Sequence, residues 1–494
     1  MARNRKPRRK KGKPSATVTR KTPGRVTAAN APKPPVGVEG IFWPPFAVRR
    51  TSAPLSMQVQ FEMSQWWEPE RILFNQLAQL RNVITHAAKT TPFYKDRLET
   101  VVMQSKKGLD LATFRQIPIL SRREFQDAGN SIHSTAVPAS HGVIYDMHTS
   151  GSTGEPLALK GTEVTATYNS AKNLREDLWH RRDFSKKCLF FRTLKSGRTI
   201  ARNSTWGPVA DPGEAVTVSM AQPAGALLET MKAEDPVYIV VHPSTLKELL
   251  YLSKEQGYQP ASLKQVRSMG EILYPDLRER CQRQWDVLVC DVYSCVEVGA
   301  LALQCPEHFQ YHVHSECTLL EVLRPDNTPC EPGEIGKTVI SSLNNFATPI
   351  LRYENGDMAE VGEPCACGRG LPVLKRIIGR ERNLAVLPDG QRLRPNLPSG
   401  PLLTELPIKH FQMVQKTTEL IEARLVTGRP LTTTEETALA DYFNKGWQHE
   451  FDFTFVYLDE IARGANGKYE VFLCEVPRPN IARVGTGSTS KVLK

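Results

Sequence analysis

The sequence lacks the features that mark membrane-spanning and exported proteins. Within its 494 residues there is no run of about 18 uncharged apolar residues, the length expected of a transmembrane helix. The N-terminus is basic, but no apolar core follows it, so we expect no signal peptide. Both absences favour a cytoplasmic protein without a transmembrane segment.

Cysteine is also scarce, with ten residues in the whole chain, and no internal repeat is apparent. In a long chain without an export signal, this cysteine usage favours reduced thiols over a disulfide framework. Some of these thiols could bind a metal ion, and their spacing is considered below.

Acidic residues are missing from the first 35 residues, which hold twelve Lys and Arg. Because the formal net charge is +12, the rest of the chain is formally neutral. We expect residues 1–54 to be a disordered basic tail followed by a Pro-rich linker. Such a tail can hold nucleic acid or an anionic surface by counterion release, or it can be a solubilising extension only.

The length of the chain predicts at least two domains, because 494 residues exceed one compact core. Strands that alternate with helices between residues 188 and 293 indicate a largely parallel sheet. We expect an α/β protein whose large domain, 55–378, has mainly parallel sheets and a small β subdomain. A small, mobile α+β domain is expected at 379–477, followed by a flexible tail at 478–494.

Apolar periodicity and turn residues give the expected elements of both domains. The expected strands are 188–191, 237–241, 266–269, 287–293, 336–341, 350–353, 371–378, 411–415, 453–458 and 469–474. The expected helices are 65–86, 245–252 with Ser244 as N-cap, 274–285 and 433–447.

One glycine-rich stretch stands between two short apolar segments, which predicts a strand, a turn and a second strand. Its first six residues are glycine or carry a hydroxyl group: Thr149, Ser150, Gly151, Ser152, Thr153 and Gly154. Glycine allows the backbone to approach an anion closely, so successive N–H groups can converge on phosphate oxygens. The stretch is no Walker loop, because no Gly-Lys-Ser/Thr follows, and a plain hairpin turn is the alternative.

Five further motifs follow in order along the chain. They are Gly270-Glu271, Tyr293-Ser294-Cys295-Val296-Glu297, Arg352-Tyr353-Glu354-Asn355-Gly356-Asp357, Ile378-Gly379-Arg380 and Gly467-Lys468. Together with the glycine-rich stretch, the series resembles the adenylate-forming superfamily, and within it the phenylacetate–CoA ligase family, which also includes deazaflavin-coenzyme adenylyltransferases. The resemblance covers about residues 60–477 and rests on the ordered set, since each motif alone is weak.

The resemblance implies a nucleotide site and a role for each motif. Residues 149–154 would cradle the β- and γ-phosphates of ATP, and Tyr293 would stack on adenine beside Gly270 and Glu271. Glu297 would hold Mg²⁺, which prefers carboxylate and phosphate oxygens. Asp357 would accept from the ribose hydroxyls, Arg380 would contact ribose and the domain boundary, and Lys468 would stabilise charge near the α-phosphate.

Each of these residues also has an ordinary structural explanation. Glu297 can be a solvated surface acid, Asp357 a turn residue and Lys468 a hairpin lysine. The chain also departs from the family pattern, because Val296 replaces a hydroxyl residue that contacts phosphate. Glu381-Arg382-Asn383 supplies one acid near the hinge where relatives often carry two. These departures bring the rate, the use of ATP and the domain rotation into question.

Two short clusters have the residue types of a zinc site. Cys305 precedes His308 and His312, and Cys365 and Cys367 form a Cys-x-Cys pair. Zn²⁺ takes four sulfur or nitrogen ligands in a tetrahedron, and either histidine can be the fourth. The family resemblance implies a structural zinc; free cysteines are the alternative. Cys295 has no base near it in sequence, so we do not expect a nucleophile there.

The sequence therefore predicts ATP-dependent activation of a carboxylic acid, an aryl acid by resemblance, with transfer to coenzyme A. Transfer to a carrier protein or another acceptor is the first alternative. A degenerate nucleotide-binding module, whose basic tail binds nucleic acid or a membrane surface, is the second. The sequence leaves the acid, the acceptor and the oligomeric state open, a homodimer included.

Overall fold

The computed structural model describes residues 49–149, 156–192, 194, 198–207, 212–380, 383–389, 392–393, 395, 406–461 and 471–476. Several predicted features lie outside the described residues: the basic tail up to residue 48, residues 150–154 of the glycine-rich loop, Glu381 and Arg382 near the predicted hinge, and Lys468. The predicted C-terminal tail also lies outside them.

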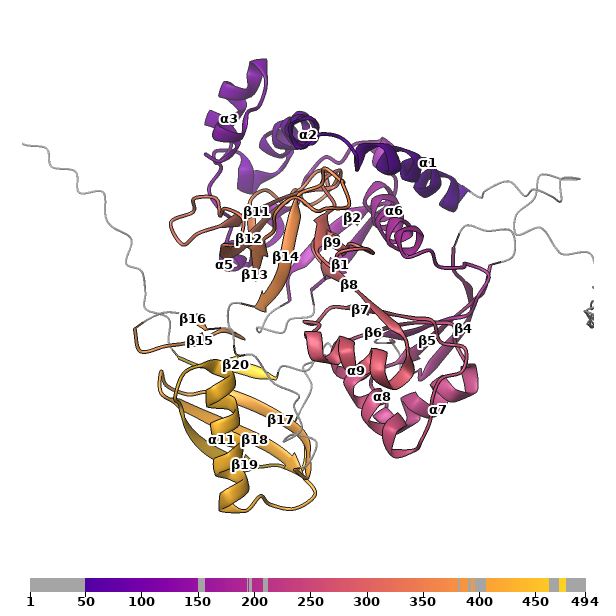
Figure 1. Ribbon diagram of the computed structural model, residues 1–494. Coiled ribbons are helices and arrows are strands. Elements are labelled where there is room, and N and C mark those ends of the chain that lie inside the picture. The colour runs from indigo at the N-terminus through magenta and orange to yellow at the C-terminus, as the bar shows by residue number, and fades with distance from the viewer. Residues whose placement is uncertain are drawn as a thin grey trace, which may run out of the picture. The chain divides into compact units, whose positions relative to one another are not determined.

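A sheet of twelve strands organises the part of the chain before residue 381 (Figure 1). Its order is β11-β12-β13-β14-β10-β9-β8-β7-β6-β3-β5-β4. The strands are β3 (Cys188–Arg192), β4 (Ile200–Thr205), β5 (Glu214–Ser219), β6 (Tyr238–Val241), β7 (Gln265–Met269), β8 (Leu288–Cys295), β9 (Gly299–Gln304), β10 (Tyr311–Val313), β11 (Thr318–Leu323), β12 (Ile335–Ser342), β13 (Tyr353–Val361) and β14 (Val373–Arg380).

Parallel pairing is confined to strands β5, β3, β6, β7 and β8, and the other pairs of this sheet are antiparallel. The predicted α/β class is confirmed, because helices connect the parallel strands. The sheet is mixed, however, whereas mainly parallel strands were expected, because the strands after β8 pair antiparallel. The antiparallel strands β9 to β14 continue the same sheet and do not form a separate one.

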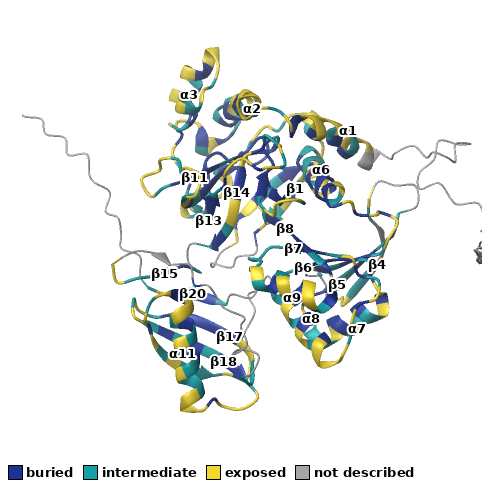
Figure 2. Ribbon diagram, viewed as in Figure 1, coloured by how far each residue is buried: buried dark blue, intermediate teal, exposed yellow. Residues whose placement is uncertain are grey.

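Three helices cover one face of the parallel strands: α7 (Ala224–Glu234), α8 (Pro243–Glu255) and α9 (Pro275–Trp285). Their apolar side chains, such as Leu228, Leu249 and Leu277, form one buried cluster with Val266 and Val289 of the strands. Helix α6 (Glu163–Trp179) lies on the other face (Figure 1). Figure 2 shows the strands mostly buried between these helices.

Five further helices belong to this region: α1 (Arg49–Ser64), α2 (Pro69–Thr90), α3 (Glu99–Gln104), α4 (Leu111–Phe114) and α5 (Arg122–Ala128). Of these, α1 packs on α6, while α2 and α5 contribute to the core beside the antiparallel strands. Leu80, Ile84 and Phe125 join Leu301 and Tyr353 in the largest buried cluster. A separate hairpin, β1 (Ile144–His148) and β2 (Ala158–Thr162), brackets the glycine-rich loop and leads directly into α6.

The C-terminal elements form a second sheet, in the order β19-β18-β17-β20. The strands are β17 (Ile408–Gln415), β18 (Leu420–Thr427), β19 (Asp452–Tyr457) and β20 (Phe472–Cys474), and helix α11 spans Thr433–Trp447. A short hairpin, β15 (Ala385–Val386) and β16 (Arg392–Leu393), precedes them. Phe443 and Trp447 of α11 pack on Met413 and Ile421 in a buried cluster of their own. The predicted domain boundary near residue 379 stays a prediction that this cluster supports.

Three expectations of the sequence were wrong in detail. Helix α1 begins at Arg49, before the predicted start of the folded region. It was not expected because Pro54 lies inside it, and a proline usually argues against a helix. The expected helix 65–86 begins only at Pro69, since proline favours a first helical position. The strand expected at 350–353 begins at Tyr353 and continues to Val361.

Ser244 is not the N-cap of α8. The helix begins at Pro243, so His242 is the cap residue, and the Ser244 side chain is turned to another element. The backbone N–H and the hydroxyl of Ser244 donate to the Glu271 carboxylate at 2.9 and 3.0 Å. A polar side chain near a helix start therefore served a long-range contact that its position in the sequence does not reveal.

Gly370 lies where two chain segments meet too closely for a side chain. A Cβ atom there would stand 1.8 Å from the Trp67 carbonyl oxygen, and the Gly370 N–H donates to the Gln65 carbonyl at 2.9 Å. We expect Gly370→Ala to lower the free energy of unfolding by about 1–3 kcal/mol, because backbone atoms must move. Chemical denaturation measures the change.

The matched control for this prediction is Gly225→Ala. Gly225 lies in the first turn of α7, and a Cβ atom there would meet nothing within 4 Å. This variant should be as stable as the parent or slightly more stable. Equal destabilisation by both substitutions would contradict the close approach at Gly370.

Candidate functional site

Tyr293 and Asp357, predicted to bind the nucleotide, contact each other although they are far apart in the chain. The Tyr293 hydroxyl, on β8, donates to Asp357 Oδ2 at 3.0 Å, on β13. The Asn355 amide donates to both the Tyr293 hydroxyl and Asp357 Oδ2 at 3.0 Å. Burial first, and then the charge of Asp357, raise the pKa of Tyr293 well above its ordinary value, so the hydroxyl stays protonated.

Arg380 completes this group from the last residue of β14. Its register places it opposite Asp357, and its Nε lies 3.0 Å from Asp357 Oδ1. A second nitrogen of the guanidinium donates to the Asn355 carbonyl at 2.6 Å. The carboxylate of Asp357 raises the pKa of Arg380 against the effect of burial, and Glu297 raises it further. Three of the predicted site residues, Tyr293, Asp357 and Arg380, thus form one connected group with Asn355.

Glu297 is buried, with 6% of its surface exposed, which excludes the alternative of a solvated surface acid. The Tyr353 hydroxyl donates to its Oε1 at 3.4 Å. Burial and the nearby Glu297 charge raise the pKa of Tyr353. Val296, the residue that departs from the family pattern, is 44% exposed beside it. A buried carboxylate costs free energy unless it is compensated, and a bound cation would compensate it.

Helix α6 holds the turn that carries Glu297. The buried ammonium of Lys172 donates to the Val298 carbonyl of that turn. Gly299 has a φ of +75° and lies so near the helix that a Cβ atom would stand 2.4 Å from Asn169 Oδ1. Because α6 follows β2 without a loop, the hairpin that brackets residues 150–155 and the turn of Glu297 are attached to one helix.

Glu271 and Gly270 follow strand β7, as predicted. Gly270 has a φ of +81°, a conformation that favours glycine and turns the chain sharply at the strand end. Glu271 accepts from Ser244, as described above, and its Oε1 lies 3.6 Å from His242 Nδ1. Both residues therefore lie at the carboxyl end of a parallel strand, where ligands of such sheets bind.

Thr149 closes the base of the glycine-rich loop. Its N–H donates to the Leu157 carbonyl at 3.0 Å, and its hydroxyl accepts from the Leu157 N–H at 2.8 Å. An Arg122 nitrogen lies 3.5 Å from the same hydroxyl, and its guanidinium also hydrogen-bonds to Tyr353. Arg122 thus links the loop to the surroundings of Glu297, and nothing in its sequence spacing indicated this.

Four functional candidates were not identified from the sequence: Asn355, Tyr353, Lys172 and Arg122. Asn355 and Tyr353 lie inside a recognised motif, so that motif was the available signal. Lys172 and Arg122 carried no sequence signal of a role in the site, because a charged residue on a helix usually faces solvent.

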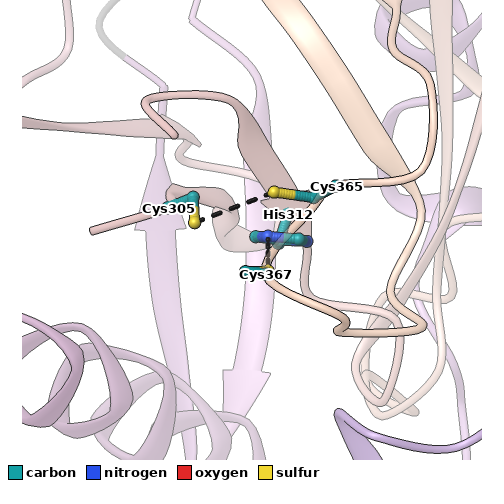
Figure 3. Close-up of side chains that lie close together, drawn as sticks. All are labelled: Cys305, His312, Cys365 and Cys367. Carbon is teal, nitrogen blue, oxygen red and sulfur yellow. Dashed lines mark hydrogen bonds between the residues drawn. The ribbon is translucent and has the colours of Figure 1, made fainter. Parts of the chain in front are cut away.

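A second site is built from three cysteines and one histidine. The ligand atoms of Cys305, His312, Cys365 and Cys367 lie within 4.8 Å of one another (Figure 3). The Cys305 and Cys365 sulfurs are 3.9 Å apart, and His312 Nε2 is 3.3 Å from the Cys367 sulfur. Of the two candidate histidines, His312 is the one in this group, whereas His308 is exposed.

The donor set and the burial of this second site fit zinc. Three sulfurs and one imidazole nitrogen are a usual structural zinc set; His312 lies on β10, and the three cysteines lie outside the strands. Burial lowers the pKa of His312 to about 4, so the imidazole is neutral, as a metal ligand must be.

Comparison with known proteins identifies the family. The family of AMP-binding enzymes matches residues 74–348, which is more than half of the chain. The chain therefore belongs to the AMP-binding enzyme family, and the predicted membership of the adenylate-forming enzymes is confirmed.

Two similar relatives are phenylacetate-coenzyme A ligases. The protein of Thermus thermophilus is 24% identical over 365 residues, which cover 70% of this chain and 78% of the relative. The protein of Escherichia coli is 22% identical over 339 residues, which cover 63% of this chain and 72% of the relative. The resemblance to phenylacetate–CoA ligases is thus confirmed at the level of the family.

Solved structures support the fold. A 2-hydroxyisobutyryl-CoA ligase in its postadenylation state matches with a TM-score of 0.67 and 17% identity, over 83% of this chain and 91% of that chain. The same enzyme in its thioesterification state matches with a TM-score of 0.55. Among the described residues, no helix is long and apolar enough to cross a membrane.

The hydroxyl of Tyr293 should contribute to stability because three polar partners surround it. We expect Tyr293→Phe to lower the free energy of unfolding by about 1–2 kcal/mol, since Asp357 and Asn355 lose a buried partner. Chemical denaturation measures it. Tyr145→Phe is the control, because its half-buried hydroxyl makes no hydrogen bond within the described structure. If both variants lost the same free energy of unfolding, the Tyr293 hydroxyl would make no specific contribution to the group around Asp357.

Proposed function

We propose that this protein is an AMP-forming acid–CoA ligase. A carboxylic acid and MgATP give an acyl-adenylate and pyrophosphate, and the thiol of coenzyme A then displaces AMP to give a thioester. An aromatic acid is proposed because the most informative relatives are phenylacetate-coenzyme A ligases. The family membership supports the adenylation step, and the relatives support the choice of coenzyme A as acceptor.

The observation that carries this proposal is the group formed by Tyr293, Asp357 and Arg380. The residues come from three strands, and hydrogen bonds and an ion pair join them. This geometry suits a nucleoside: an aromatic ring lies beside a carboxylate that can accept from ribose hydroxyls, and an arginine holds the carboxylate in place. Gly270 and Glu271 would line the same nucleotide pocket.

Glu297 is the proposed ligand of Mg²⁺. Magnesium would supply positive charge at the triphosphate and draw the pyrophosphate oxygens into position. The protein has little covalent work in such a reaction, because positioning and charge stabilisation supply most of the rate. Residues 149–154 would contribute N–H and hydroxyl donors to the β- and γ-phosphates, and Lys468 would stabilise the charge at the α-phosphate.

Val296 is expected to lower the rate of the proposed adenylation step. It is exposed next to the buried Glu297, at the position where relatives place a hydroxyl residue. Valine cannot donate a hydrogen bond to phosphate, so we expect a lower adenylation rate than in a relative with Thr or Ser there. Glu297 and the group around Asp357 do not depend on that hydroxyl.

The three-cysteine site is proposed to hold a structural zinc ion. It would tie Cys305, just after β9, and His312 of β10 to the loop of Cys365 and Cys367. Metal bonds across such loops contribute directly to folding free energy. Rotation of the C-terminal domain between the two half-reactions, binding of an anionic partner by the basic tail and a homodimer are further proposals that rest on sequence alone.

Pyrophosphate release from MgATP tests the proposed reaction, with a panel of aryl and alkyl carboxylic acids and with or without coenzyme A. We expect acid-dependent release, and a thioester when coenzyme A is present. Lys468→Ala and Glu297→Gln should each lower the rate about 100-fold or more, because each removes charge from the transition state.

The control for this experiment is Lys445→Ala, which removes an exposed lysine from α11 and should leave the rate unchanged. Release of pyrophosphate without thioester formation would point to a carrier protein or another acceptor. If ATP bound but no acid caused release, the degenerate nucleotide-binding module would replace the ligase.

Metal analysis tests the zinc proposal. We expect about one zinc per chain, and removal by a strong chelator should lower the melting temperature by several degrees. Cys367→Ser should abolish zinc binding. Cys330→Ser, a similarly half-buried cysteine outside the group, is the control and should keep it. If removal of zinc left the melting temperature unchanged, the proposed structural zinc site would be contradicted, and the four side chains would be free.

A further inference from the structure

The two faces of the central parallel strands differ in what covers them. Helices α7, α8 and α9 bury one face under aliphatic side chains. On the other face, β3 presents Cys188, Phe190 and Arg192, and β7 presents Arg267 and Met269. Phe190 and Met269 keep part of their surface exposed and Arg192 is exposed, although all three lie on or at the end of central strands.

Helix α6 lies against this second face and pairs with one of its charged side chains. Arg267 is paired there, because one of its nitrogens lies 3.2 Å from Glu176 Oε2 and another donates to Asn173 at 2.7 Å. Arg182 pairs with the same Glu176 and with Asp177. The two acids of α6 therefore serve the two arginines that are already buried.

Arg192 has no such partner. Within the described structure no carboxylate lies within ion-pair distance of it, and its guanidinium stands 5.1 Å from the centre of the Phe190 ring. Burial by surrounding atoms lowers the pKa of Arg192, and the nearby positive charge of Arg267 lowers it further. The side chain is exposed and carries a positive charge that no acid of the described chain neutralises.

The position of Arg192 relates this charge to the nucleotide site. It ends β3, which is separated from β7 by the single strand β6. Because neighbouring strands lie about 4.8 Å apart, the end of β3 is roughly 10 Å from the end of β7, where Gly270 and Glu271 lie. His242, at the end of β6, lies between them. A small aromatic acid spans about this distance.

We propose that Arg192 binds a second anionic group of the acid substrate, at the end opposite the carboxylate that is activated. This inference rests on the proposed ligase function and makes the substrate an aromatic acid with a second acidic substituent. The guanidinium can bind a carboxylate through two parallel hydrogen bonds. The partly exposed Phe190 ring beside it offers a flat apolar surface to the aromatic part.

Matched acids test this inference in the adenylation half-reaction, without coenzyme A. The probes are 1,4-phenylenediacetate and its monomethyl ester, which differ mainly in the second charge, with phenylacetate for comparison. We expect the parent protein to prefer the diacid over the ester in kcat/KM. Arg192→Gln should lower this preference about 10- to 100-fold, as expected for a lost charged hydrogen bond, and Arg192→Lys should restore part of it.

The control variant is Arg283→Gln, which removes an exposed arginine from α9 on the opposite face of the same sheet and should keep the preference. Calorimetric binding of the diacid, with a non-hydrolysable ATP analogue present, provides a readout that does not need turnover. Binding that is lost in Arg192→Gln and kept in Arg283→Gln supports the site.

Three results would overturn the inference. The parent protein could use the ester or phenylacetate as well as the diacid, which would leave the ligase function standing. In a parallel assay of the full reaction with coenzyme A, the effect of Arg192→Gln could be confined to the KM of coenzyme A, which would assign the charge to that substrate. If no acid released pyrophosphate and the diacid did not bind, the ligase proposal and the anion site would fail together.

Discussion

The carboxylate of Asp357 is the interaction on which the proposed nucleotide site depends. It accepts from Tyr293 and Asn355 and pairs with Arg380, so it joins residues from β8, β13 and β14. A buried charge of this kind is stable only while each partner stays in place. The constraint fixes the end of β14 relative to Tyr293, and it positions the last residue before the chain continues to the C-terminal sheet.

A second constraint concerns where the charges of the site are buried. Glu297 is almost inaccessible, and Lys172 and Arg122 approach the same region from helices α6 and α5. Helix α6 begins directly after the loop hairpin, and its later residues pair with Arg267 on one face of the sheet. One helix thereby couples the proposed phosphate loop, the turn of the proposed magnesium ligand and the sheet face that also carries Arg192.

Much of the fold could be predicted from local pattern. The α11 helix and strands β3, β6 and β7 lie within a residue or so of the expected positions, because each is a strongly periodic or continuously apolar segment. Strands β4, β5, β9, β10, β11 and β18 were missed. Segments with small or polar residues, such as β4 and β10, become strands only through their neighbours in a sheet, which is a tertiary effect. Strands β11 and β18 carry apolar residues that could have indicated them.

The sequence by itself determined the family and the ordered set of motifs, and it placed Tyr293, Glu297, Asp357 and Arg380 in the proposed site. It also supplied the four candidate zinc ligands, with the histidine left open. Only the tertiary structure decided that His312 joins the cysteines, that Glu297 is buried and that Arg192 has no acid partner among the described residues. The physical reason is that burial and charge pairing depend on contacts between distant segments, whereas motifs and periodicity are properties of neighbouring residues.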